Sequence, residues 1–421
     1  MKNRILKLLK IDLVKHNIVF LFGTLAISVF NYLYYPVVGR LVSIVEFGEI
    51  QASISIFMQL GILLTAFGYV VANITHNSQS DYAKQNILFL ERVTLLLSVL
   101  TLVVLIVFGR QLQSTLQFSS ILPLVLIGIL VILNVPSTTR SYVLQGMKRL
   151  KEVAISGIIF SIGKLVVTVV LILAGVNAEA AIIGYIIAQI VTLFYLSFKS
   201  KDYFPSVRLS FAKTVKVTDR VNMKRELKFG LLVIILLAGL STLYSFDVVL
   251  ARLFLTPEAA GEYSGVSSVA RIIYFATASV AGVLIASVAL KDSYSRSRRV
   301  LLGSALIVTV IGLVILAIFS IFPTESLTII LGSSYAHVAS LLPLVCLFMF
   351  VASLNNLLIT FQIARRKYNA VVPVVLGVLG LSGFLVVKHS SVQDLVLGYI
   401  IANVVIFVIL TLQIARRNKN E

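Results

Sequence analysis

The 421-residue chain has few charged side chains: 13% of its residues are charged, whereas about a quarter are charged in soluble domains. Apolar residues make up 59% of the sequence. Water cannot be the main solvent of a chain with this balance. The scarcity of charge excludes an ordinary soluble domain and predicts a membrane protein.

Cysteine and tryptophan are almost missing, since the chain has one cysteine, Cys346, and no tryptophan. A single thiol excludes a disulfide framework and a paired-thiol metal or redox site. The four histidines are not paired at helical spacing, and no phosphate-cradling glycine-rich loop occurs. A membrane glycan polymerase would need sizeable polar loops, and the expected outer loops are only a few residues long. We therefore predict that the chain is not an enzyme and holds no metal or other cofactor.

Long apolar runs follow one another almost without interruption. A helix needs about 20 apolar residues to cross a hydrocarbon core roughly 30 Å thick. The runs are continuous rather than alternating, which excludes barrel strands. The predicted fold class is an all-α membrane protein of about twelve transmembrane helices. They are expected near residues 17–39, 47–73, 90–109, 118–140, 153–174, 178–198, 229–254, 260–290, 300–322, 338–362, 370–387 and 393–415.

The net charge of +19 could suggest nucleic acid as a partner, but its distribution argues otherwise. On the helix map, 30 of the 36 lysines and arginines fall on the side of both termini. Lys and Arg accumulate in cytoplasmic loops of membrane proteins. The basic balance therefore predicts cytoplasmic termini and no nucleic-acid partner.

Two stretches of the sequence resemble each other and indicate a repeat. GRLVSIVEFGE leads from the first expected helix into the second, and ARLFLTPEAAGE leads from the seventh into the eighth. Arg40 aligns with Arg252, and Gly48 aligns with Gly261. Transporters commonly place their substrate between two such copies.

The repeat predicts a division into an N-terminal half (1–198), a cytoplasmic basic linker (199–228) and a C-terminal half (229–421). Each half has an even number of helices, so the two copies share one orientation. We expect two parallel six-helix bundles around a central cavity.

Three ionisable residues fall deep within expected helices: Lys164, Asp247 and Arg271. Such residues cost about 2.5–3.5 kcal/mol on insertion scales, so each is a functional candidate. Lys164 and Arg271, one from each half, would make a cavity suited to a phosphate or pyrophosphate group. Asp247, the only acid expected in a helix middle, could carry H⁺ or Na⁺. The alternative is structural pairing, including a pair between Asp247 and Arg271.

Four further residues are weaker substrate-binding candidates. Arg40 and Arg252 lie at outer helix ends, where long basic side chains commonly extend to the membrane interface. Asn31 and Asn355 lie inside helices and could bond sugar hydroxyls. Their alternative role, shared with Gln59, Asn134 and Asn356, is hydrogen bonding between helices.

The order and spacing of these motifs resemble a known group. GRLVSIVEFGE, its echo SFDVVLARLFLTPEAAGEYSGVSSVARI and the QGMKRL after the fourth expected helix are similar to those of the bacterial polysaccharide flippases. These belong to the multidrug/oligosaccharidyl-lipid/polysaccharide exporter superfamily, and the resemblance covers nearly the whole chain.

The resemblance implies a flippase of the bacterial inner membrane. It would move an undecaprenyl-pyrophosphate-linked oligosaccharide by alternating access, for cell-surface polysaccharide synthesis and with H⁺ or Na⁺ exchange. Its partners would be membrane lipids and a polysaccharide polymerase complex. Such relatives often carry an Arg, an Asp and a basic residue where Arg271, Asp247 and Lys164 fall. The alternative is a cation antiporter of the multidrug and toxin extruder type, which needs buried acids.

Overall fold

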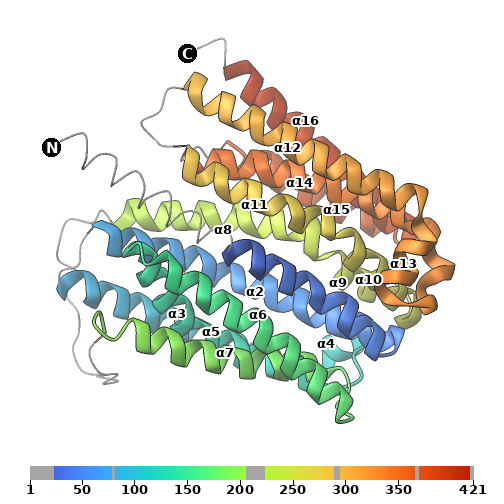
Figure 1. Ribbon diagram of the computed structural model, residues 1–421, viewed down its shortest axis with the longest axis horizontal. Coiled ribbons are helices and arrows are strands. Elements are labelled where there is room, and N and C mark those ends of the chain that lie inside the picture. Colours follow the sequence, from blue (N-terminus) through green and yellow to red (C-terminus); the bar gives the residue numbers. More distant parts are fainter. Residues whose placement is uncertain (1–22, 78–80, 205–222, 289–293, 366–368, 418–421) are drawn as a thin grey trace. The chain divides into compact units, whose positions relative to one another are not determined.

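The protein is described by a computed structural model over residues 23–77, 81–204, 223–288, 294–365 and 369–417, and every regular element in these ranges is a helix (Figure 1). The first covers residues 23–41. The others are α2 (Ile44–Asn77), α3 (Asp81–Val107), α4 (Gly109–Thr115), α5 (Leu122–Gly146), α6 (Leu150–Leu173), α7 (Glu179–Lys199), α8 (Met223–Ser245), α9 (Asp247–Phe254), α10 (Pro257–Ala270), α11 (Ile272–Ser287), α12 (Tyr294–Ile321), α13 (Pro323–Leu331), the 3₁₀ helix η1 (Ser333–Leu341), α14 (Leu342–Ala364), α15 (Val371–Val387) and α16 (Val392–Arg417).

About half of these helices are long and apolar enough to cross a membrane by themselves. Within the described residues, eight meet that criterion singly, or ten when each of two bent helix pairs counts as one span. The helix over 23–41 and the shorter apolar helix α15 account for the other two expected segments. The all-α prediction is confirmed, and the count agrees with about twelve spans.

Exposed apolar side chains support this assignment. Leu96 on α3, Leu306 on α12 and Val387 at the end of α15 are 70%, 66% and 82% exposed. Water would penalise such surfaces, whereas lipid does not. The protein is therefore a multi-pass membrane protein.

The structure corrects the helix map at one boundary and at two helix breaks. The third helix was expected to begin near residue 90, but α3 begins at Asp81. The seventh and eighth were expected to be continuous, but each is broken. α8 and α9 meet at a bend of 59°, and α10 and α11 meet at a bend of 41°. Most of the expected linker, residues 205–222, lies outside the described residues.

Contacts divide the protein into two compact units. The first draws on Met1–Leu33, Leu63–Gly109 and Leu122–Gly230, and the second on Tyr34–Ile62, Arg110–Ile121 and Leu231–Glu421. In the first unit α7 packs on α5 and α6. In the second unit α14 is the central element, because it packs on α10, α11, α12 and α16 and most of its residues are buried. These contact-based units are not the two halves that the sequence repeat predicts, and the division into halves stays a prediction.

Candidate functional site

The two helix breaks bring Asp247 and Arg271 together in the second unit. Asp247 is the first residue of α9, directly after one break, and Arg271 is the single residue between α10 and α11. An Nη atom of Arg271 donates a hydrogen bond to Oδ1 of Asp247 at 2.7 Å. Their side chains are only 3% and 0% exposed. The break thus carries a buried ion pair.

Backbone geometry at the first break supplies a further acceptor. The N–H groups of Val249 and Leu250 both donate to the carbonyl of Phe246, so the regular bonding pattern stops there. The preceding carbonyl, that of Ser245, accepts a hydrogen bond from Arg271 at 3.3 Å. The Nε of Arg271 has no hydrogen-bond partner among the described residues, so the guanidinium keeps donor capacity that a ligand anion could use.

Two hydroxyl groups complete the surroundings of the carboxylate. Tyr263 and Ser267 donate to Oδ2 of Asp247 at 2.8 and 2.5 Å. Sequence reasoning missed both residues. Together with Arg271 they recur at intervals of four along one helix face, a polar stripe that the sequence does display. Asp247 is therefore held by one cation and two hydroxyls.

A chain of amides lies near the same helix break. Asn355 on α14 donates to the backbone carbonyl and Oδ1 of Asn403 on α16, at 2.9 and 3.1 Å. Asn403 in turn donates to the carbonyl of Leu243 at 3.3 Å. Asn355 thus bonds another helix, as the alternative reading expected. Asn403, which the sequence analysis did not single out, ties α16 to the end of α8.

Lys164 belongs to the first unit and is 6% exposed. Its Nζ donates to the hydroxyl of Tyr185 on α7 at 3.1 Å. The same nitrogen lies 4.6 Å from the ring centre of Tyr185 and 5.6 Å from that of Phe160. Two aromatic faces and a hydroxyl therefore surround this ammonium group. Because Lys164 and Arg271 fall in different units, the shared central cavity stays a prediction.

Arg252 does not extend to the interface, so that expectation is wrong. The residue is fully buried. Its guanidinium donates to the carbonyls of Leu116, Gln117 and Val45 and lies 5.4 Å from the ring centre of Phe118. The turn after α4 and the start of α2 thus supply backbone oxygens that replace water. Arg252 therefore connects α9 to the segments around α4 and α2.

Gly48 and Gly261, which align in the predicted repeat, make room for this arrangement. A Cβ atom on Gly48 would lie 2.8 Å from Cα of Gly261 and 3.3 Å from an Nη atom of Arg252. A Cβ on Gly261 would lie 2.3 Å from the carbonyl oxygen of Ile44. The start of α2 and the start of α10 therefore approach at van der Waals distance only because neither residue has a side chain.

Arg40 is exposed, as expected for a residue at a helix end. Its guanidinium donates to the carbonyls of Ile329 and Ile330, in the last turn of α13. These carbonyls have no partner within the helix, and a cation suits that end of the helix dipole. Arg40 therefore also contributes to the structure of the second unit.

The remaining amides mostly connect helices. Gln189 donates to Asn134 at 3.1 Å, and Gln59 donates to Thr242 at 3.4 Å. Asn31 is half-buried on the helix over 23–41, and its role stays a prediction.

Asp247 is not the sole acid inside a helix, which corrects the sequence analysis. Because α3 begins earlier than expected, Glu91 lies well within it. Its carboxylate accepts a hydrogen bond from Arg140 at 3.4 Å, with both side chains nearly buried. Among the described residues, no group of three or more His, Cys, Asp or Glu side chains is placed to hold a metal ion.

Solved structures with the same fold are transporters. An inward-facing multidrug resistance MATE family transporter of the MOP superfamily matches with a TM-score of 0.71 at 14% identity, over 95% of this chain and 99% of the other. The MATE multidrug transporter DinF-BH also has a TM-score of 0.71, at 15% identity over 96% and 95%. A MOP superfamily transporter from Pyrococcus furiosus matches with a TM-score of 0.58 at 12% identity, over 96% of this chain and 95% of the other. The chain therefore has the fold of the MOP superfamily transporters.

The family of the protein is identified by comparing its sequence with models of known families. The profile of a family described as "Polysaccharide biosynthesis protein" matches residues 13–285, more than half of the chain. The chain belongs to this polysaccharide biosynthesis protein family, and its fold is that of the MOP superfamily transporters. No curated protein matches it.

Proposed function

We propose that this membrane protein is a transporter, specifically a flippase that moves an undecaprenyl-pyrophosphate-linked oligosaccharide across the bacterial inner membrane by alternating access. Membership in a polysaccharide biosynthesis family supports a glycan substrate. The buried pair of Arg271 and Asp247 supports the mechanistic part of the proposal, because a cation that could bind an anion is in direct contact with an acid that could bind a proton. Both termini are cytoplasmic in this proposal, and a polysaccharide polymerase complex receives the product.

The pair suggests how substrate binding and proton binding are coupled. While Asp247 is ionised, its charge neutralises Arg271, and an incoming pyrophosphate would meet repulsion from the carboxylate. Binding of H⁺ by Asp247 removes that charge and leaves Arg271 as an uncompensated cation. Arg271 can then bind a phosphate oxygen through its free Nε and the Nη group released from Asp247. Release of the proton restores the ion pair and expels the anion.

In this scheme the proton and the anion bind together, so proton binding and anion binding favour each other. A bound anion stabilises the protonated acid as much as the proton stabilises the bound anion. Tyr263 and Ser267 can turn their hydroxyl hydrogens or accept a hydrogen bond from the protonated acid, so both states of Asp247 retain partners. Na⁺ is the alternative coupling ion.

Lys164 is proposed as a second contact for the pyrophosphate. Its ammonium group rests on two aromatic rings and a hydroxyl. An ammonium ion in this setting is weakly hydrated and gains from an added anion.

A cation antiporter of the multidrug extruder type is the alternative function, favoured by the fold of the solved MATE transporters. The Pyrococcus furiosus relative is described as having a binding pocket of reverse polarity that suggests a different function. The buried cations Lys164 and Arg271 argue here for an anionic substrate.

Complementation separates the two functions. A strain lacking its own flippase receives wild type, Arg271→Gln or Lys164→Met, and lipid-linked intermediates are measured in each leaflet. Rescue by wild type, with loss in both variants at matched membrane expression, supports the proposal. Drug resistance without rescue supports the antiporter. Full rescue by both variants contradicts the roles of these cations.

A further inference from the structure

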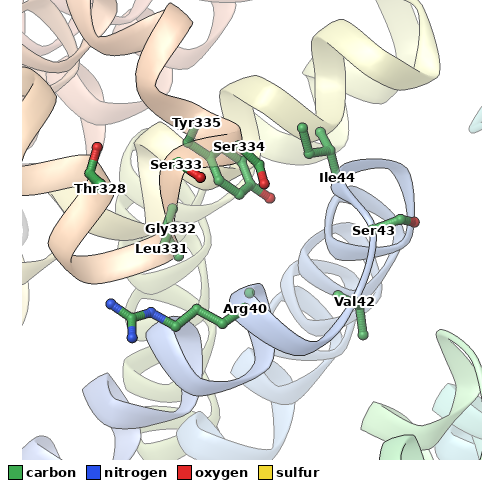
Figure 2. Close-up of a pocket in the computed structure, with 11 residues that line it drawn as sticks. Arg40, Val42, Ser43, Ile44, Thr328, Leu331, Gly332, Ser333, Ser334 and Tyr335 are labelled. Carbon is green, nitrogen blue, oxygen red and sulfur yellow. The ribbon is translucent and has the colours of Figure 1, made fainter.

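A polar pocket of about 470 Å³ opens within the second unit, and neither Asp247 nor Arg271 lines it. Figure 2 shows that two segments form it: the turn from Arg40 to Ile44, which joins the helix over 23–41 to α2, and residues from Thr328 to Tyr335, which join α13 to η1. Its size falls within the range of about 300–1,000 Å³ that is typical of small-molecule sites.

The lining has one cation, several hydroxyl groups and no carboxylate. Arg40 supplies the charge. The hydroxyl groups belong to Ser43, Thr328, Ser333, Ser334 and Tyr335. This composition suits a ligand that combines one anionic group with hydroxyl groups, because Arg40 can bind the anion and the hydroxyl groups can bond those of the ligand. The hydroxyl of Ser43 is the exception, since it already donates to the carboxylate of Glu46.

The guanidinium of Arg40 is already oriented. Its bonds to the carbonyls of Ile329 and Ile330 hold it at the end of α13 and use only part of its N–H donors. Its planar fork matches a phosphate oxygen pair, and little side-chain freedom remains to be lost on binding.

Tyr335 provides a second, independent sign of a ligand. The residue is 1% exposed and lines the pocket, yet its hydroxyl has no hydrogen-bond partner among the described residues. Its ring is fixed by edge contact with Phe47 at 6.4 Å and by Gly265, where a Cβ atom would lie 2.2 Å from the ring. A buried hydroxyl without a partner costs free energy that a bound acceptor or donor would recover.

The surroundings indicate a lipid rather than a soluble molecule. Arg40 lies one residue before the end of the helix over 23–41. Beside it, Leu41 is 40% exposed and Ile329 is 71% exposed, so apolar surface borders the polar pocket. Acyl chains would cover that apolar surface while the headgroup occupies the pocket, as in other basic lipid sites between membrane helices.

We propose that this pocket binds an anionic phospholipid with a hydroxylated headgroup, of which phosphatidylglycerol is the probe. The phosphate binds Arg40, and the glycerol hydroxyls bond Tyr335 and the serines after Gly332. This site is separate from the ion pair, so it stands or fails independently of the proposed flippase activity.

Native mass spectrometry of the purified full chain tests the site, with phosphatidylglycerol and phosphatidylethanolamine offered at equal concentration. Wild type should retain phosphatidylglycerol preferentially. Arg40→Gln should weaken its binding about tenfold, which corresponds to the loss of a charge-assisted hydrogen bond. Arg110→Gln is the matched control, because Arg110 is an exposed arginine of the same unit that does not line the pocket. It should bind as wild type does.

Tyr335→Phe separates ligand binding from folding, and it decides the outcome if Arg40→Gln fails to fold. Removing an unpartnered buried hydroxyl should leave the melting temperature unchanged or raise it, while phosphatidylglycerol binding falls several-fold. Equal phosphatidylglycerol binding by Tyr335→Phe and wild type would overturn the proposal, as would equal binding of the two lipids. Competition by soluble glycerol 3-phosphate at the concentration of the lipid would also overturn it, since the occupant would then be a free phosphate ester.

Discussion

Arg271 and Asp247 meet at 2.7 Å where two helices change direction, each residue lying at or beside its own break. The pair therefore joins two bends that the helix backbone alone would leave unconnected. Motion of either bend must stretch or break this contact. The strength of this ion pair therefore depends on the angles of the two helix bends.

Removal of Asp247 should strand a buried cation. We expect Asp247→Ala to lower the free energy of unfolding by about 3–5 kcal/mol. The double variant Asp247→Ala/Arg271→Met should recover most of that loss, because no uncompensated charge remains. Thermal unfolding of the purified protein in detergent measures both. Additive losses in the double variant would show that the two residues do not stabilise each other.

Arg252 should be irreplaceable by lysine. The guanidinium of Arg252 donates hydrogen bonds to three separate carbonyls. The single ammonium group of a lysine cannot donate to all three in the same geometry. We expect Arg252→Lys to cost about 2–3 kcal/mol of stability. Arg40→Lys, at an exposed arginine that also bonds carbonyls, is the control and should cost clearly less. Equal melting temperatures for the two variants would contradict the buried position of Arg252.

Gly261 should tolerate no side chain. A methyl group there would lie 2.3 Å from the backbone oxygen of Ile44, and backbone cannot move aside cheaply. We expect Gly261→Ala to destabilise the protein by about 1–3 kcal/mol. Gly282→Ala is the control, because nothing lies within 4 Å of its Cβ position. It should be neutral or stabilising by up to about 1 kcal/mol, since alanine favours helix. A lower melting temperature for Gly282→Ala than for Gly261→Ala would refute the packing argument.

The predicted topology can be tested with single cysteines after Cys346→Ser. Lys151→Cys lies in an expected cytoplasmic loop, and Asn177→Cys lies in an expected outer loop; both positions are exposed. An impermeant thiol reagent added to intact cells should label only Asn177→Cys. Labelling of Lys151→Cys alone would reverse the orientation of the chain.

The sequence predicts most of the helices because about 20 consecutive apolar residues have one stable arrangement in lipid. It also predicts that Lys164, Asp247 and Arg271 are buried. The breaks at Phe246 and Arg271 were not predictable, since neither proline nor glycine lies at either position. What the structure shows at these breaks is a tertiary contact, the ion pair between Asp247 and Arg271.

The burial of Arg252 escaped prediction for a related reason. Its acceptors are backbone carbonyls of residues more than 100 positions away. Every residue has a backbone carbonyl, so no residue type in the sequence marks these acceptors. The start of α3 was misplaced because its first turns are polar and resemble a loop. That error hid Glu91 within the helix and made Asp247 look like the sole buried acid.

Transport by purified protein in proteoliposomes tests the central claim most directly. Labelled undecaprenyl-pyrophosphate-linked oligosaccharide is placed in one leaflet, and its movement is followed with and without a pH gradient. The flippase account predicts gradient-stimulated movement by wild type. It predicts movement without gradient dependence by Asp247→Asn, and loss of movement by Arg271→Gln in folded protein. Equal gradient stimulation of Asp247→Asn and wild type, or full transport by Arg271→Gln, would contradict it.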